Sequence, residues 1–293
     1  MAATIDDLVV RVADICTYKW DMVRNRPLAY LVSGFVGGAM VVFGATLALS
    51  VSAGVAEKLA PGLANLLMGL VFMFSLVVIM ISGMTLVTAD MYVGVIGIFH
   101  RRITWPWFVW GVVLGYMGNF LGSMFFMWLI SHSGAYAAWP WLAKSHALGV
   151  AKMGYTATQI FVMGIVCTWM LQTAAILFVK AEGDMAKIAL AAYGPLAFVA
   201  GMTEHCIANI GFLALPLFQQ ELYLSVAQAS GLTDPVLLHW GFGRYGWAHN
   251  QLYTVLGNLV GGILFVAIPF QLVSNPKRVT AIYREKKGFM CKI

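Results

Sequence analysis

The stretch Thr203-Glu204-His205-Cys206-Ile207-Ala208-Asn209 places an acid, an imidazole and an amide in the middle of an otherwise apolar segment, residues 187–217. A second apolar segment, residues 63–99, is interrupted in the same way by Ser82-Gly83-Met84-Thr85-Leu86-Val87-Thr88-Ala89-Asp90. Both segments exceed the roughly 20 residues that cross a bilayer as a helix. Polar groups and irregular backbone persist at that depth only where protein covers them or where they line a watery cavity. The paired interruptions therefore predict an inverted repeat with a binding site between its halves.

The composition of the whole chain is that of a membrane protein. Hydrophobic residues make up 61% of the 293 residues, charged residues make up 10%, and the mean hydropathy is +0.83. Soluble domains carry roughly 25% charged residues, so a soluble fold is excluded. We predict an all-α integral membrane protein with six transmembrane helices, of which the second and fifth are interrupted. The expected spans are residues 29–55, 63–99, 105–130, 156–179, 187–217 and 251–273.

The distribution of basic residues predicts the orientation. All but four of the 18 lysines and arginines fall in the two chain ends or in the connections near residues 101–102 and 180–187. Basic residues gather on the cytoplasmic side of membrane proteins, so both ends are expected there, which requires an even number of spans. Residues 1–28 are expected to form a cytoplasmic N-terminal amphipathic helix, residues 29–273 the six-span membrane domain, and residues 274–293 a cytoplasmic basic tail. The four basic residues expected on the opposite side are Lys58, Lys144, Lys152 and Arg244.

Four motifs carry a resemblance to a known family. They are residues 203–209, Leu86-Val87-Thr88, Leu256-Gly257-Asn258-Leu259-Val260-Gly261-Gly262, and Lys152 shortly before the fourth span. In these motifs the chain resembles the formate/nitrite transporter family, and the resemblance covers essentially its whole length. It implies an aquaporin-like six-helix protomer with one pore, and a homopentamer as the assembly.

The resemblance also implies roles for individual residues. Thr88 and His205 would face each other at the pore centre, and Lys152 would lie in an entrance. Asn209 and Asn258 would line or support the pore. The candidates for apolar constrictions are Phe72, Leu76, Leu86, Val87 and Phe198.

Four residues depart from the usual pattern of the family. Val87 stands where an aromatic residue is usual, Thr85 where glutamate is frequent, and Thr168 where asparagine is usual. Asp90 follows the break where small or amide residues are common. Thr168 and Asp90 are expected to support the site. A smaller side chain at Val87 would widen the constriction or change its gating, so the departures bear on the substrate.

His205 is the residue expected to carry the transport chemistry. The ordinary pKa of imidazole is about 6.5, the only side-chain value near neutrality. A neutral imidazole can donate a hydrogen bond or a proton to an anion, and an acid that becomes neutral crosses an apolar constriction far more easily than its anion. The alternative is a structural histidine bonded to a backbone carbonyl. The hydroxyl of Thr88 would orient the anion or the imidazole, or would bond its own backbone.

Three charged residues near the breaks have two interpretations each. A Glu204 carboxylate is unfavourable in lipid and would repel an anion in the pore, so it is expected to bind freed backbone N–H groups or a nearby side chain. Asp90 is interpreted in the same way. Lys152 would raise the anion concentration at the pore mouth, or it is an ordinary interfacial lysine.

These observations predict a channel or proton-coupled transporter for small monovalent anions in the inner (plasma) membrane of the cell, and not an enzyme. Formate and nitrite are the first candidates, hydrosulfide and small carboxylates remain open, and the expected partners are these anions, protons and the lipid bilayer. The alternative is an aquaporin-like neutral-solute pore, for which the sequence lacks paired Asn-Pro-Ala boxes. A haem-binding redox subunit would need paired histidines at membrane depth, and only His205 is so placed. No metal, cofactor or nucleic acid is expected, and the four cysteines without paired spacing are Cys16, Cys167, Cys206 and Cys291.

Overall fold

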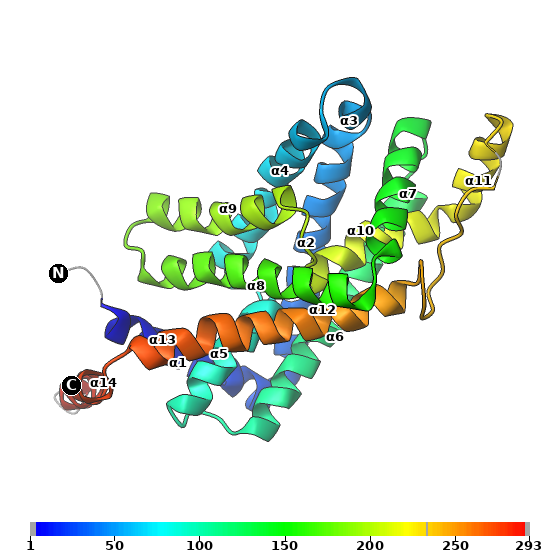
Figure 1. Ribbon diagram of the computed structural model, residues 1–293. Helices are drawn as coiled ribbons and strands as arrows, with labels where there is room; N and C mark the ends of the chain where they lie inside the picture. The colour runs from blue at the N-terminus through cyan, green and yellow to red at the C-terminus, as the bar shows by residue number, and fades with distance from the viewer. Residues whose placement is uncertain (1–3, 233, 291–293) are drawn as a thin grey trace.

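The structure is a computed structural model that describes residues 4–232 and 234–290, and these residues fold into a set of packed helices (Figure 1). Cys291 and Lys292, which belong to the predicted basic tail, lie outside the described residues. The helices are α1 (Ile5–Asn25), α2 (Pro27–Ser52), α3 (Val55–Lys58), α4 (Pro61–Ser82), α5 (Val87–Phe99), α6 (Trp105–His132), α7 (Trp139–Gly154), α8 (Ala157–Lys180), α9 (Asp184–Ala200), α10 (Cys206–Phe218), α11 (Gln220–Ala229), α12 (Trp247–Gly262), the π-helical turn η1 (Ile263–Ala267), α13 (Ile268–Val273) and α14 (Pro276–Met290).

Several of these helices have the length and composition of membrane spans. Within the described residues, five helices are long and apolar enough to cross a membrane, and a sixth results if α10 and α11, bent by 54° at their junction, are counted as one span. The prediction of an all-helical chain with several apolar, membrane-length helices is confirmed. The predicted segment 187–217 corresponds to α9 and α10 together. The five long helices are Pro27–Ser52, Pro61–Ser82, Trp105–His132, Ala157–Lys180 and Trp247–Val273.

Both interrupted segments contain a break between consecutive helices. α4 ends at Ser82 and α5 begins at Val87, whereas α9 ends at Ala200 and α10 begins at Cys206. Apart from Ser82, the last residue of α4, the polar residues quoted from these segments lie in the two breaks or in the first turn of the helix that follows. Each break therefore brings free backbone groups and polar side chains into the interior of the bundle.

The two breaks start with the same local geometry. Gly83 has a φ of 73° and Met202 a φ of 56°, the left-handed conformation that ends many helices. In each case the next N–H donates to the carbonyl five residues earlier, at 3.1 Å. Glycine adopts this conformation without strain, whereas methionine holds it only where the surrounding structure enforces it.

Close glycine contacts join the first and last helices of each half of the chain, residues 27–132 and 157–273. A Cβ atom on Gly34 of α2 would lie 3.1 Å from the Cα of Gly118 on α6. A Cβ atom on Gly164 of α8 would likewise lie 3.1 Å from the Cα of Gly257 on α12. Small residues allow helices to approach closely in membranes, so the same type of crossing recurs in both halves.

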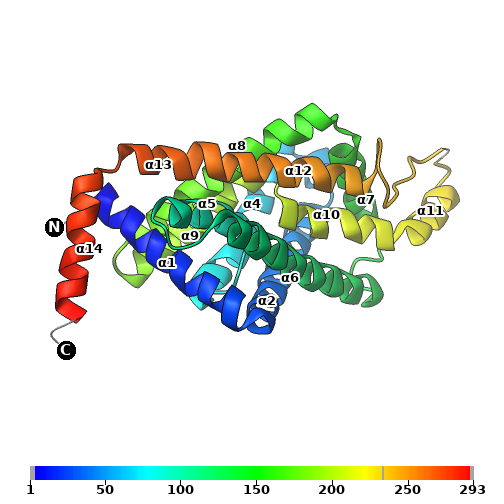
Figure 2. The same cartoon turned by 90° about the horizontal axis from the view of Figure 1, so that it is seen from below.

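Different helices lie at the two ends of the molecule. α1 and α14 lie together at one end, while α7 and α11 lie at the other (Figure 1 and Figure 2). Asp6 Oδ1 accepts a hydrogen bond from the backbone N–H of Asn275 at 2.7 Å, and Val279 packs against Val9 and Val10. These contacts hold α14 on α1. The predicted N-terminal helix and basic tail thus meet at one end of the molecule.

Candidate functional site

Thr88 and His205 meet in the interior, one from each break. The Oγ1 atom of Thr88 lies 3.1 Å from Nε2 of His205, and both side chains are buried. His205 is also the residue before α10, where its Nδ1 accepts the N–H of Ala208 at 3.2 Å. Because Nδ1 accepts a hydrogen bond, the neutral imidazole carries its proton on Nε2. The proton that His205 can give away therefore faces Thr88.

Two cavities lie near this pair and share no lining residue: His205 lines the first, and Leu86 and Ala89, close to Thr88 in the sequence, line the second. The first, of about 200 Å³, is called the α7-side cavity; the second, of about 260 Å³, is called the α1-side cavity. The lining of the α7-side cavity includes Lys152, Phe198, Glu204, His205, Asn209 and Phe212. The lining of the α1-side cavity includes Lys19, Leu76, Thr85, Leu86, Leu171 and Gln172.

Aromatic rings pack beside His205, and two of them, Phe198 and Phe212, line the α7-side cavity. The ring of Phe72 lies 5.6 Å from that of Phe198 and 5.9 Å from that of Phe212, between centroids. The ring of Phe198 stacks on the imidazole of His205 at 5.1 Å. Phe212 was not predicted, although it lies seven residues after His205 and therefore on the same face of the helix. These rings form an apolar barrier beside the imidazole.

Three leucines close the α1-side cavity. Leu76 of α4, Leu86 of the first break and Leu171 of α8 are all buried, line this cavity and belong to one apolar cluster. Leu171 was not predicted, because nothing in the pattern of a single helix tells which of its leucines faces another break. Val87, a predicted constriction residue, is buried in the same cluster but lines neither cavity.

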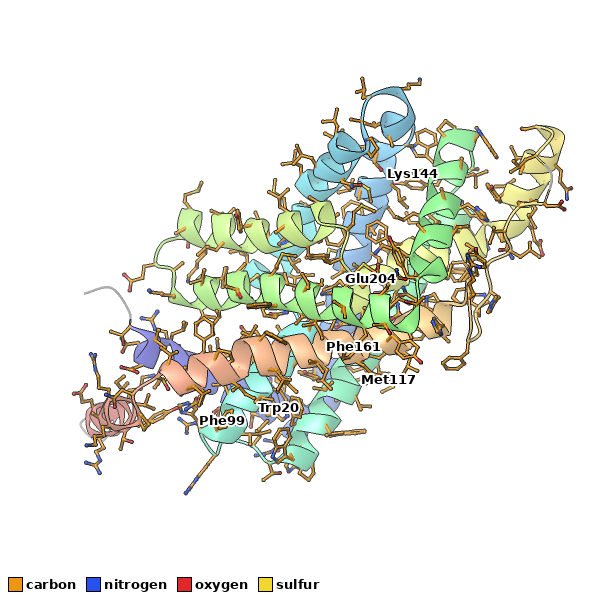
Figure 3. The ribbon with its side chains drawn as sticks, viewed as in Figure 1. Trp20, Phe99, Met117, Lys144, Phe161 and Glu204 are labelled. Atoms are coloured by element: carbon orange, nitrogen blue, oxygen red, sulfur yellow. The ribbon has the colours of Figure 1, made fainter. Side chains whose placement is uncertain are left out.

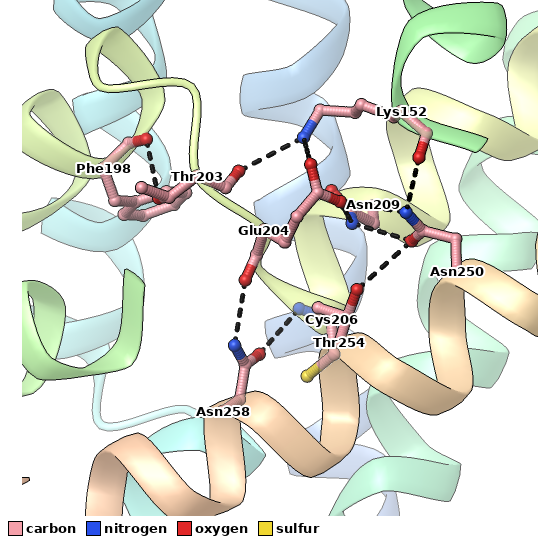
Figure 4. A network of polar contacts seen from close by, with 9 residues as sticks. All are labelled: Lys152, Phe198, Thr203, Glu204, Cys206, Asn209, Asn250, Thr254 and Asn258. Carbon is pink, nitrogen blue, oxygen red and sulfur yellow. Dashed lines mark hydrogen bonds and ion pairs between the residues drawn. The ribbon is translucent and has the colours of Figure 1, made fainter. Parts of the chain in front are cut away.

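Glu204 is the centre of a buried polar network between α7, the second break and α12 (Figure 3 and Figure 4). Its Oε1 accepts from Lys152 Nζ at 2.6 Å, and its Oε2 accepts from Asn250 Nδ2 at 3.0 Å and from Asn209 Nδ2. Lys152 also donates to the carbonyl of Thr203 at 3.2 Å. The side chain of Glu204 is fully buried and that of Lys152 is 12% exposed. The acid is thus paired with side chains, and Lys152 is a cavity residue rather than an exposed interfacial lysine.

α7 carries this lysine and was not predicted. Its 16 residues mix charged and apolar side chains and are too few for a span. Asn250 was also missed, since nothing in its own sequence surroundings relates it to Glu204.

Asp90 has a comparable network at the other cavity. It forms an ion pair with Lys19 of α1, and its Oδ2 accepts from the hydroxyl of Tyr30 at 2.5 Å. Asp90 is the fourth residue of α5, as Asn209 is of α10. Each half of the chain therefore places a lysine–carboxylate pair beside one cavity. Lys19 was not among the predicted site residues, because it is distant in the chain from both breaks.

An asparagine bridges each break to the neighbouring helices. Asn258 Oδ1 accepts from Cys206 N at 2.8 Å, and its Nδ2 donates to the carbonyls of Gly164 and Glu204, both at 2.9 Å. These three contacts engage the backbone, so Asn258 supports the second break.

Asn119 makes the equivalent contacts in the first half. Its Oδ1 accepts from Val87 N at 2.9 Å, and its Nδ2 donates to the carbonyls of Gly34 at 2.8 Å and Thr85 at 2.9 Å. Asn119 was not among the predicted site residues, although the pattern Gly-Asn-x-x-Gly occurs in both α6 and α12, at residues 118–122 and 257–261.

Replacing either asparagine by leucine should lower the free energy of unfolding by about 2–3 kcal/mol, because the N–H and carbonyl groups of a break lose their partners in a buried setting. Thermal unfolding of the detergent-solubilised protein measures this. Asn25→Leu is the control, since Asn25 bonds only Asp21 at the surface, and it should change stability by less than about 0.5 kcal/mol. Equal stability of Asn258→Leu and the control would contradict a supporting role.

Thr168 and the cysteines contribute less to the site. Thr168 is buried beside Gly261 and Gly262, and its hydroxyl has no hydrogen-bond partner among the described residues. Three cysteines, Cys16, Cys167 and Cys206, are buried free thiols. The part of the chain that the structure describes contains no group of three or more His, Cys, Asp or Glu side chains arranged to hold a metal ion.

Comparison with known proteins gives a consistent result. A family model described as formate/nitrite transporter matches residues 6–272. A probable formate transporter of Methanothermobacter thermautotrophicus is 28% identical, with 87% of this chain and 92% of that protein covered. The nitrite transporter NirC of Salmonella typhimurium is also 28% identical, with 84% of this chain and 83% of that protein covered.

Solved structures have the same fold. An FNT family ion channel superposes with a TM-score of 0.78 at 25% identity, covering 92% of this chain and 99% of that one. A pentameric formate channel with formate bound superposes with a TM-score of 0.69 at 21% identity, covering 84% and 97%.

Proposed function

The chain belongs to the formate/nitrite transporter family, and from this premise we propose that each protomer conducts small monovalent anions, formate or nitrite first, between its two cavities. The observation that carries the proposal is the contact between Thr88 and His205, buried between two cavities that each present a lysine. The relatives are transporters and channels, a class of membrane proteins distinct from enzymes.

The charges and barriers suggest an order of events. Lys152 and Lys19 raise the local anion concentration in the two cavities, although each is partly neutralised by its carboxylate partner. The apolar barriers then oppose entry of an ion without its water. His205 lies directly behind the Phe198 ring and directs Nε2–H towards the path, so it can donate a hydrogen bond to the anion. If that proton passes to the anion, a proton from the aqueous side has to return to the imidazole, because a neutral ring that gives up its Nε2–H is otherwise left as an imidazolate. A neutral acid passes the leucines more easily than its anion.

The proposed topology has six spans, formed by α2, α4 with α5, α6, α8, α9 with α10, and α12 with α13. The left-handed break, the close glycine crossing and the asparagine contacts each occur in both halves of the chain. This recurrence supports an inverted repeat. The excess of basic residues at the α1 and α14 end supports a cytoplasmic location for both termini, in a plasma membrane. On this proposal residues 1–28 and 274–293 are cytoplasmic segments flanking the membrane domain.

A homopentamer in the bilayer is the proposed assembly. One structural relative is a pentameric formate channel. A stripe of exposed apolar side chains along α6 suits contact with lipid or with a neighbouring protomer, because a soluble surface of this kind would be unfavourable. The stripe comprises Val109, Val113, Met117, Leu121 and Phe125.

Proteoliposomes test the proposed function. Purified protein should raise the fluxes of formate and nitrite over those of empty vesicles, while glycerol flux stays unchanged. An aquaporin-like neutral-solute pore would instead raise the flux of glycerol or water and leave the fluxes of formate and nitrite unchanged. The hydrogen bonds of Asn258 favour the anion path, because its amide is engaged with backbone instead of facing a solute. Absence of any anion flux would overturn the proposal.

A further inference from the structure

Met202 holds a strained backbone conformation at the start of the second break. Its φ of 56° lies in the left-handed region, which is unfavourable for a residue with a Cβ atom. Three hydrogen bonds hold the break in place. The N–H of Thr203 donates to the carbonyl of Phe198 at 3.1 Å, the Thr203 hydroxyl donates to the same carbonyl at 2.9 Å, and Lys152 donates to the carbonyl of Thr203 at 3.2 Å. Backbone strain concentrates at functional sites, so the methionine side chain is a candidate for a role in transport.

The corresponding place in the first break has no side chain. Gly83 has a φ of 73° and lines the α1-side cavity, and a Cβ atom added to it would lie in open space, with no described atom within 4 Å beyond its chain neighbours. Glycine adopts this conformation without strain, so glycine at residue 202 would relieve the backbone. The chain instead keeps a methionine there. The side chain, and not the backbone, therefore distinguishes the second break from the first at this position.

The side chain of Met202 lines the α7-side cavity where the cavity is open. It is 47% exposed, whereas His205 and Phe198, which line the same cavity, are 1% and 2% exposed. The cavity thus leads from Met202 to the buried imidazole. Met202 also precedes Thr203, whose carbonyl binds the ammonium of Lys152. A molecule entering from the exposed part of the cavity therefore meets a flexible, apolar thioether beside the cation that attracts anions.

We propose that Met202 sets the size limit for anions at the opening of the α7-side cavity, an inference that rests on the proposed transport function. The side chain has no charge and no N–H or O–H group, so it discriminates by volume and not by a hydrogen bond. Formate and nitrite fit past it, whereas acetate and longer monocarboxylates have to displace it before they reach Lys152. The preferred substrate class is therefore monoanions no larger than formate or nitrite.

Met202→Gly and Met202→Ala both remove the thioether, and only glycine also relieves the backbone. Wild-type and variant proteins are reconstituted in proteoliposomes, and initial fluxes of formate and acetate are measured above those of empty vesicles. In both variants the ratio of acetate to formate flux should rise about tenfold while formate flux stays within about twofold, because an apolar pocket discriminates one methylene by this order. Met185→Ala is the control, since Met185 is 78% exposed and lines neither cavity, and its flux ratio should equal that of the wild type.

The outcomes separate this inference from the proposed function. No formate flux in the wild type would overturn both. Wild-type formate flux with an unchanged acetate-to-formate ratio in both variants would overturn the role of Met202 alone. A raised ratio in Met202→Gly but not in Met202→Ala would overturn it as well, because the change would then come from the relaxed backbone. If Met202→Gly does not assemble, as judged by size-exclusion chromatography, Met202→Ala is held to the same criteria.

Discussion

His205→Asn is expected to lower proton-coupled formate uptake by about 100-fold, the lower range for loss of a positioned proton donor. The Nε2–H of His205 faces Thr88 because Nδ1 is occupied by the backbone N–H of Ala208. Asparagine can still accept that N–H before α10 and so preserves the start of the helix. Asparagine cannot relay a proton, so formate uptake measured between about pH 5 and pH 8 should lose the pH dependence that proton transfer at residue 205 provides.

The measurement is the initial rate of formate uptake into proteoliposomes over that pH series. Thr88→Val is the matched variant: it removes the partner of Nε2 but keeps the imidazole, so uptake should fall and still vary with pH. A His205→Asn protein with the wild-type pH profile would show that the imidazole takes no part in proton transfer. Loss of the oligomer in His205→Asn would assign the histidine a structural role instead.

Glu204→Leu should lower the free energy of unfolding by about 3–5 kcal/mol, because it leaves the ammonium of Lys152 buried without a counter-charge. Asn209 and Asn250 lose an acceptor at the same time. The double variant Lys152→Met/Glu204→Leu removes both charges and should recover most of the loss. Thermal unfolding in detergent compares the three proteins.

The control for this prediction is the ion pair between Arg11 and Glu182, whose side chains are 41% and 77% exposed. Glu182→Leu should change stability by less than about 1 kcal/mol, since water screens an exposed pair. If the double variant is no more stable than Glu204→Leu, the loss comes from the asparagine contacts and not from the unpaired charge.

The two breaks could be predicted because their signals lie within their own segments of the sequence. The apolar lengths and the polar residues in segments 63–99 and 187–217 located both breaks, because a membrane restricts where such residues can occur. The family resemblance added the expectation that Thr88 and His205 face each other, and in the structure Thr88 Oγ1 lies 3.1 Å from His205 Nε2.

Partners from distant parts of the chain could not be predicted in this way. Lys19 is 71 residues from Asp90, and Asn119 reaches residues 34 and 85. The side chain of Lys19 is ordinary within its own helix and acquires its role only through packing, whereas the Gly-Asn-x-x-Gly pattern that Asn119 shares with Asn258 was a signal for it. Val87, which the family resemblance suggested as a constriction residue, is buried in the same apolar cluster as Leu76 and Leu86, and its role in the constriction stays a prediction.

The two asparagine bridges have a consequence for biosynthesis. Every group that Asn119 binds lies between residues 34 and 119, and every group that Asn258 binds lies between residues 164 and 258. Since chains emerge from the ribosome N-terminus first, the first break can be satisfied as soon as α6 has been inserted, before any of the second half exists. The contact between Thr88 and His205 forms only when α10 arrives. The two halves can therefore mature one after the other, and the conduction path is completed last.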